Sequence, residues 1–396
     1  MLSPRQMTRI VAIFCLAAAW LAPSALAADT AVTLTLSKTS AVHGHAVMAS
    51  GQIQPAVAGE EVAIETGTGD AWTEVARATV DSTGTFEAAF EATASGFVRA
   101  RELSTGAMSE PRALDVVPNV RARALPGRAF VGAKVKLRVT PASYSGRVSI
   151  VVRSGTQVMA TVSRKVAGGK VTMLVPAPGV GRFVVVMTFP AEGGLSSRVA
   201  SIRLRSAART VSYGSSGPDV RGLTRRLADL RFRVPAISSS FGYELVDSVL
   251  AFQKAYGLSR SGFVDTLTWR ALTGTRELSP RYRGPEAHIE VDKTRQILLD
   301  VRNGSVVAVL PVSTGATGNT PEGKHEIRWK APATTTWLGP AILYRTLTFY
   351  GNSFAIHGFP SVPAYPASHG CVRIPIWTAD WLYNRSPVGE TVYVYA

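Results

Sequence analysis

The 396-residue chain has little cysteine, little lysine and no long apolar runs. No apolar run approaches the roughly 20 residues that a membrane-spanning helix needs. The proportions of apolar residues (46%) and charged residues (18%) exclude a disordered or collagen-like chain. The length leaves room for two to four domains, each able to bury a core.

Acidic residues are also scarce, with 27 Asp and Glu against 43 Lys and Arg, which gives a formal net charge of +16. Only nine of the basic residues are lysines. A charge of this size favours an acidic partner, which can be nucleic acid, a membrane or an anionic polymer.

The N-terminus narrows the choice of partner. Arg5 and Arg9 precede an apolar run at 10–21, and small residues surround Ala27. This pattern predicts a secretory signal peptide over 1–28 and an exported protein. Export argues against nucleic acid and leaves membrane contact only to an uncleaved signal anchor. Removal of the signal peptide would leave one thiol, that of Cys371.

Short β-prone runs broken by turns fill the next two segments, 29–117 and 118–207. Both segments resemble bacterial immunoglobulin-like β-sandwiches. The second has 15 basic residues and one acid, Glu192. We therefore expect 118–207 to contact anionic wall polymers through an attraction that salt weakens.

Helical periodicity replaces β alternation in 208–276. Three apolar stripes predict a small three-helix bundle, with the first helix opening at Pro218 and the third at Asp265. The phrases Ala251-Phe252-Gln253-Lys254 and Gly262-Phe263-Val264-Asp265 resemble the peptidoglycan-binding type 1 domain. That resemblance implies targeting to cell-wall glycopeptide without chemistry.

The last segment, 285–396, returns to β patterning. Asn303-Gly304 between two apolar runs predicts a tight β-hairpin, because both turn residues must accept positive φ. The complete fold class is therefore multidomain and mainly β, with two sandwiches, a helical bundle and a mostly β C-terminal domain. The segment 337–350 is either a lid over a site or a plain strand pair.

His357, His369 and Cys371 are the residues most suited to chemistry. A cysteine attacks carbonyl groups as a thiolate, so it needs a base or a positive neighbour, and either histidine is a candidate base. The glycine before the cysteine lets the backbone approach closely, and the amides of Gly370 and Cys371 are candidate donors to an oxyanion. Two imidazoles and a thiolate also fit zinc, although the spacing lacks the usual ligand pattern.

Ser368-His369-Gly370-Cys371-Val372-Arg373, downstream of Ile356-His357-Gly358, resembles the catalytic domain of the YkuD-like L,D-transpeptidases. The stretches 312–315 and 320–323 match that family as well. The resemblance implies that Cys371 is the nucleophile, His357 the base oriented by a carbonyl near Gly358, and His369 part of the oxyanion region. It further places substrate-binding residues at Gly358, Ser368, Gly370, Arg373 and Tyr350, with no metal and no cofactor.

The same resemblance implies a reaction on peptidoglycan stem peptides. A thioacyl-enzyme forms with release of D-Ala, and transfer to a second stem amine makes a 3-3 cross-link. An L,D-carboxypeptidase or cross-link hydrolase would use the same nucleophile with water as acceptor. A different class of protein, a wall-binding protein without catalysis, would use only the sandwiches and the bundle.

Overall fold

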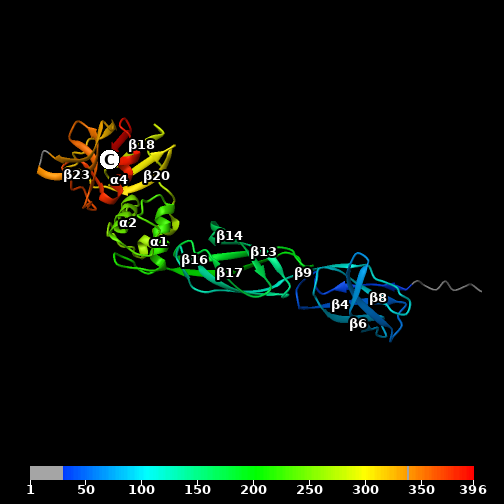
Figure 1. The fold of residues 1–396 in the computed structure, drawn as a ribbon. Helices are drawn as coiled ribbons and strands as arrows, with labels where there is room; N and C mark the ends of the chain where they lie inside the picture. Colours follow the sequence, from blue (N-terminus) through cyan, green and yellow to red (C-terminus); the bar gives the residue numbers. More distant parts are fainter. Residues whose placement is uncertain (1–29, 337–338) are drawn as a thin grey trace, which may run out of the picture. The chain divides into compact units, whose positions relative to one another are not determined.

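The computed structural model describes residues 30–336 and 339–396 (Figure 1). The predicted signal peptide at 1–28 lies outside the described residues. The described chain falls into two compact units. The first contains residues up to Thr39 together with 46–91 and 96–114, and the second contains 40–45, 92–95 and 115–396.

The first unit is built of β-strands in two sheets, with the neighbour orders β1-β4-β2, where β7 also pairs β4, and β9-β8-β5-β6. Buried and exposed side chains alternate along β7, as expected for a strand with one face on a core. The strands are β1 (Ala31–Val32), β2 (Thr35–Leu36), β4 (Ala46–Gln54), β5 (Glu61–Thr68), β6 (Ala71–Thr79), β7 (Thr85–Glu91), β8 (Gly96–Glu102) and the start of β9 (Arg112–Val117).

The second unit opens with another pair of sheets, ordered β10-β12-β15 and β11-β17-β16-β13-β14. Two long strands at 157–167 and 198–207 were not anticipated, because their side chains are mostly polar or exposed and carry a weak apolar alternation. The strands of this part are β3 (Ser40–Val42), which pairs with the end of β9, β10 (Asn119–Ala124), β11 (Gly127–Arg128), β12 (Ala133–Thr140), β13 (Ser145–Ser154), β14 (Gln157–Ala167), β15 (Gly169–Val175), β16 (Gly181–Phe189) and β17 (Arg198–Ala207).

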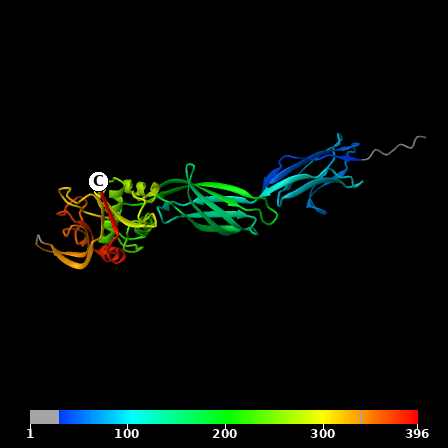
Figure 2. The same ribbon diagram turned by 90° about the horizontal axis from the view of Figure 1, so that it is seen from above.

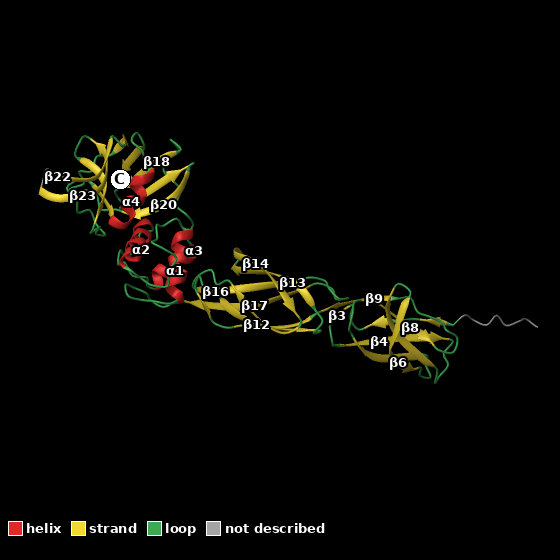
Figure 3. Ribbon diagram, viewed as in Figure 1, coloured by secondary structure: helices red, strands yellow, loops and turns green. Residues whose placement is uncertain are grey.

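Three helices follow, α1 (Pro218–Asp229), α2 (Tyr243–Ala255) and α3 (Thr266–Gly274), and Figure 3 shows them grouped together in red. The Asp265 carboxylate caps α3 by accepting the Thr268 N–H at 2.8 Å. The apolar stripes read from the sequence on α1 and α3 are fully buried, and in the stripe on α2 only Tyr256 at its end remains partly exposed. These helices are called the helical domain below.

The C-terminal part, called the catalytic domain below, has two sheets ordered β20-β19-β18-β26-β21 and β22-β23-β24-β25. Its last strand runs parallel to its first, and Figure 2 shows that strand in red. The elements are β18 (Ala287–Asp292), β19 (Ile297–Arg302), β20 (Ser305–Pro311), β21 (Gly323–Glu326), β22 (Trp329–Thr336), β23 (Gly339–Tyr350), β24 (Phe354–Phe359), β25 (Val372–Pro375), α4 (Ile376–Arg385) and β26 (Thr391–Tyr395).

The mainly β fold class is confirmed. Asn303 and Gly304, both at positive φ, join β19 to β20 as the hairpin prediction requires. The helix α4 was missed, because its ten residues include three aromatic ones, which are weak helix formers. The segment at 337–350 belongs to the β22–β23 strand pair, although positions 337 and 338 lie outside the described residues.

The strand β19 is buried on both faces and so separates two cores. Ile297, Leu299 and Val301 pack with the three helices, while Leu298 packs with the second sheet and α4. Because side chains alternate along a strand, one face of the sheet covers the helical domain and the other face supports β24 and β25. Those two strands carry the candidate site.

Candidate active site

His357 and Arg373 stand opposite each other in the parallel pair of β24 and β25. The neighbouring residues Ile356 and Val372 point into the core on the other face of this sheet. Cys371 immediately precedes β25 and lies two residues before Arg373, which places it on the Arg373 side in extended chain. The parallel register thus brings the three polar side chains to one face.

The His357 imidazole is 2% exposed, and its Nδ1 lies 3.1 Å from the Gly358 carbonyl oxygen. A carbonyl only accepts, so this contact assigns the proton to Nδ1 and leaves Nε2 as the acceptor. Burial is the main cause that lowers the pKa of His357 to about 4. The hydrogen bond to Gly358 opposes it by raising the pKa, and the Arg373 charge lowers the pKa by a smaller amount. His357 is a neutral imidazole with a free acceptor lone pair at neutral pH.

The Cys371 thiol is partly exposed and lies 3.4 Å from the Ser353 carbonyl oxygen. Burial raises the pKa of Cys371, and the Ala355 N–H and the Arg373 guanidinium only partly offset that effect. The resting pair is therefore a neutral thiol beside a neutral imidazole, and the proton must leave the thiol as the carbonyl is attacked.

The loop that carries the nucleophile is fixed by Ser368 and Thr320. The Ser368 hydroxyl donates to the Cys371 carbonyl at 2.6 Å and accepts the Gly370 N–H at 3.0 Å. The Thr320 hydroxyl donates to the Gly370 carbonyl at 2.7 Å and accepts the Gly315 N–H at 2.9 Å. Ser368 is thus a support of the loop, and the Gly370 amide, a candidate oxyanion donor from the sequence, donates to Ser368 in this structure.

The segment 312–315 lies beside this loop. Ser313 pairs with Arg373 and Gly315 pairs with Ser368. The Gln296 amide holds Thr314 on two sides, accepting its N–H at 2.9 Å and donating to its hydroxyl at 2.7 Å. The sequence marked 312–315 and 320–323 as family motifs without assigning roles, and Gln296 carried no signal because a polar residue in the turn before a strand is ordinary.

Gly370 occupies a position that only glycine fits. Its φ is +139°, and a Cβ there would lie 2.5 Å from Cε1 of Phe354. The prediction of a close backbone approach at Gly370 agrees with this geometry. On its other side, a Cβ on Gly315 would come within 3.1 Å of the Gly370 Cα.

The other two predicted site residues, His369 and Tyr350, are exposed to solvent. The His369 side chain is exposed, and its carbonyl accepts the Asn319 amide at 2.9 Å. Tyr350 is half exposed and stacks edge-on with Phe354, 5.8 Å between ring centroids. It also lines a hollow of about 710 Å³ with residues of β21 and β23. Within the described residues, 30–336 and 339–396, no three His, Cys, Asp or Glu side chains lie close enough together to hold a metal ion.

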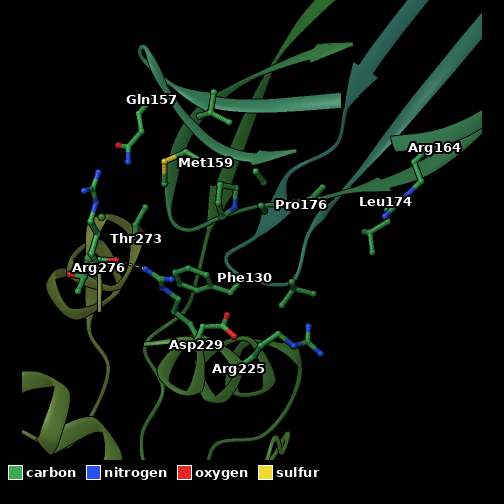
Figure 4. A pocket seen from close by; sticks show the side chains of 18 residues that line it. Phe130, Gln157, Met159, Arg164, Leu174, Pro176, Arg225, Asp229, Thr273 and Arg276 are labelled. Atoms are coloured by element: carbon green, nitrogen blue, oxygen red, sulfur yellow. Dashed lines mark hydrogen bonds between the residues drawn. The ribbon is translucent and has the colours of Figure 1, made fainter. Parts of the chain in front are cut away.

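A second hollow of about 530 Å³ lies away from the cysteine (Figure 4). It lies between the β-strands of residues 118–207, called the basic sandwich below, and the helical domain. Gln157 and Met159 of β14 face Arg225 and Asp229 of α1 across it. Its lining includes four arginines and one acid; the charged residues are Arg164, Arg225, Arg226, Arg276 and Asp229. The cleft is therefore basic, with an apolar floor around Phe130.

None of the helices in the described part of the chain is long and apolar enough to cross a membrane. This finding covers only the residues that the structure describes.

Comparisons with known proteins confirm the two resemblances read from the motifs. Residues 286–394 match the YkuD family, described as the L,D-transpeptidase catalytic domain, and residues 216–272 match a family of peptidoglycan binding domains. The search of curated proteins gave no match.

Among solved structures, the chain is similar to an L,D-transpeptidase from Xylanimonas cellulosilytica DSM 15894. The identity is 33% over 48% of this chain and 98% of that one, with a TM-score of 0.45. An L,D-transpeptidase from Mycobacterium smegmatis shares 14% identity over 70% of this chain and 99% of that one, with a TM-score of 0.27. The family match at 286–394 carries the relationship, and neither superposition does.

Proposed function

Because the chain belongs to the YkuD family of L,D-transpeptidases through its C-terminal domain, we propose that Cys371 is the nucleophile and His357 the base of an acyl transfer between peptidoglycan stems. The observation that carries this proposal is the parallel register of β24 and β25, which sets a buried, Nδ1-bonded imidazole on the same face as a thiol.

The first half-reaction forms a thioester. The Cys371 sulfur attacks the carbonyl carbon of the third stem residue while Nε2 of His357 takes the thiol proton. Collapse of the tetrahedral intermediate breaks the C–N bond to D-Ala, and the proton on His357 passes to the leaving amine. The Cys371 amide is our proposed oxyanion donor, because Ser368 already occupies the Gly370 amide.

The second half-reaction reverses these roles. A side-chain amine of a second stem attacks the thioester, His357 takes a proton from that amine, and the thiolate leaves and is reprotonated. The product is a 3-3 cross-link. Arg373, which stacks its guanidinium over Phe359 at 4.4 Å beside the two reacting groups, is our proposed contact for a stem carboxylate, with Gly358 and Tyr350 as further pocket residues.

The test is product analysis with two stems. Tetrapeptide donor and an acceptor stem should give free D-Ala and a cross-linked dimer with wild-type protein and neither with Cys371→Ala. Tripeptide without dimer would make the protein an L,D-carboxypeptidase, since water would then be the acceptor. Cleavage of preformed dimers would make it a hydrolase, and wall binding without any product would make it a binding protein.

The N-terminal parts extend this proposal from chemistry to location. Peptidoglycan-acting domains place the protein in the cell wall or extracytoplasmic space. We propose that the chain is exported by the signal peptide at 1–28. The intact mass of the secreted protein should then correspond to a chain that begins at Asp29, while retention of Met1 in a membrane fraction would indicate an uncleaved anchor.

The arginine-lined cleft is our proposed contact for anionic wall polymers. Arg164 comes from the basic sandwich and Arg225 from α1, so both parts contribute charge to one opening. Charge reversal of both residues to Glu should weaken binding to isolated walls and flatten its salt dependence. The matched control reverses Arg203 and Arg205, two exposed arginines of β17 that do not line the cleft. Equal effects of both changes would assign the attraction to net charge alone.

A further inference from the structure

The helical domain and the catalytic domain share one hydrophobic core. Phe232, which follows α1, pairs with Val309 of β20 through the backbone. The Val309 amide donates to the Arg231 carbonyl at 2.8 Å, and its carbonyl accepts the Arg233 amide at 3.0 Å. The buried side chains of β19 pack on the same helices. The helical domain and the catalytic sheet therefore share one continuous core.

Lys254 of α2 crosses this interface. Its side chain is 1% exposed, and Nζ donates to the Val312 carbonyl at 2.8 Å and to the Pro363 carbonyl at 3.3 Å. Val312 begins the segment that pairs with the nucleophile loop. Pro363 lies in the loop 360–366, which connects His357 to Cys371 along the chain. A buried ammonium group is costly unless it is bonded, and both of these bonds go to the catalytic domain.

Arg260 of the helical domain holds the next carbonyl of the same loop. One guanidinium nitrogen donates to the Ala364 carbonyl at 2.8 Å, and another donates to the Thr294 carbonyl at 3.3 Å. The Tyr365 carbonyl then accepts the Ser313 hydroxyl at 2.8 Å. Three consecutive carbonyls of the loop are therefore bound by side chains, and two of those side chains come from the helical domain.

The loop has few other anchors. Ser361, Tyr365 and Pro366 are exposed, and among its members Val362 is the one buried apolar side chain. A loop without a core is ordered by its polar contacts, and loss of those contacts restores its conformational freedom. Disorder in 360–366 would be passed to the thiol, because Ala367 and Ser368 follow directly.

We infer that Lys254 and Arg260 are positioning residues of the active site, so that the helical domain holds the loop 360–366 in place besides carrying wall binding. Neither residue touches the reacting atoms. The inference rests on the proposed function for its effect on rate. An ångström-scale displacement of a nucleophile can cost about 100-fold in rate, so we expect a fall of about 10-fold to 100-fold when both cations are removed.

The experiment uses the full chain with Lys254→Met, Arg260→Met and the double variant. Methionine keeps an unbranched apolar stem and removes the donors. Arg260 is exposed, so its replacement leaves the core intact even if Lys254→Met folds poorly. The matched control is Arg221→Met, an exposed arginine on α1 of the same domain. The measurements are kcat and KM for stem transfer, and hydrogen exchange of the Ala367 and Ser368 amides, which both donate to the Thr314 carbonyl.

The expected result is a lower kcat with KM changed less than twofold, together with exchange at 367–368 at least tenfold faster while the β18–β19 amides keep their protection. Unchanged kcat and exchange in the double variant would overturn the inference. Equally faster exchange in the loop and in β18–β19 would also overturn it, because that pattern reports general destabilisation. If wild-type protein transfers nothing, the proposed function fails, and the exchange measurement still decides whether the loop is held.

Discussion

The hydroxyl of Thr320 lies 2.7 Å from the carbonyl oxygen of Gly370 and donates to it across 50 residues of chain. The same hydroxyl accepts the Gly315 amide, so one buried side chain joins the nucleophile loop to the segment 312–315 beside it. The thiol and the imidazole are both neutral at rest, so no ion pair between them holds them in place. The site therefore depends on supports of this kind.

Thr320→Val should remove both bonds while keeping the shape of the side chain. Leaving a buried amide and a buried carbonyl without their partner costs about 1–3 kcal/mol for each group. We expect the free energy of unfolding in urea to fall by that amount and kcat to fall at least tenfold. Thr294→Val, at an exposed turn, is the control and should change neither. An active Thr320→Val variant of normal stability would show that this support is dispensable.

Gly370→Ala should inactivate the protein more than an equivalent change elsewhere. The positive φ strains any Cβ, and here the Cβ would also collide with Phe354. Gly389→Ala is the matched control, because Gly389 has φ +89° with nothing within 4 Å of the added atom. Both variants should lose stability from strain, and only Gly370→Ala should lose transfer activity. Equal activities would mean that the close approach at Gly370 does not position the thiol.

Alkylation of Cys371 by iodoacetamide should keep accelerating as the pH rises through 9. Burial raises the pKa of this thiol and lowers that of His357, so the folded protein holds little thiolate at neutral pH. The rate is measured by intact mass between pH 5 and 10. A plateau with a midpoint between pH 5 and 7 would reveal a thiolate–imidazolium pair instead.

His357 should make the protein less stable as the solution becomes acidic. Its pKa is about 4 in the folded protein against 6.5 as the ordinary value, so the unfolded chain binds the proton first as the pH falls from 6.5 to 4. The contribution over that window is about 3 kcal/mol. Urea unfolding at pH 7 and pH 4 should show a smaller loss for His357→Gln than for wild type. Identical losses would mean that the imidazole is not buried as a neutral group.

Much of the architecture could be predicted from local patterns. The Asn303-Gly304 turn, the helix stripes and the Asp265 cap are each encoded within a few residues. By contrast, β14 has little apolar alternation and α4 has weak helix formers, so neither element could be predicted from its local sequence. The site divides in the same way: the motif identifies Cys371 and His357, but their common face depends on the parallel register of β24 and β25.

The supports of the site were the hardest part to predict. Thr320 bonds Gly370 across 50 residues of chain, and Lys254 bonds Pro363 across 109. Gln296 holds Thr314, whose carbonyl accepts the Ala367 and Ser368 amides. Each of the three is an ordinary polar residue in its local context. The sequence indicates Lys254 only as part of the peptidoglycan-binding motif. Its burial against the catalytic domain follows from packing of α2 on β19 and β20, which no local pattern encodes.

The most direct test of the central claim is the mass of the protein after brief mixing with a carbapenem, a β-lactam whose ring opens when a nucleophile is acylated. We predict a single adduct equal in mass to the carbapenem on wild-type protein, located on the peptide that contains Cys371. Cys371→Ala should remain unmodified, and His357→Gln should acylate at least 100-fold more slowly. An adduct that persists in Cys371→Ala, or no adduct on folded wild-type protein, would contradict the assignment of Cys371 as the nucleophile.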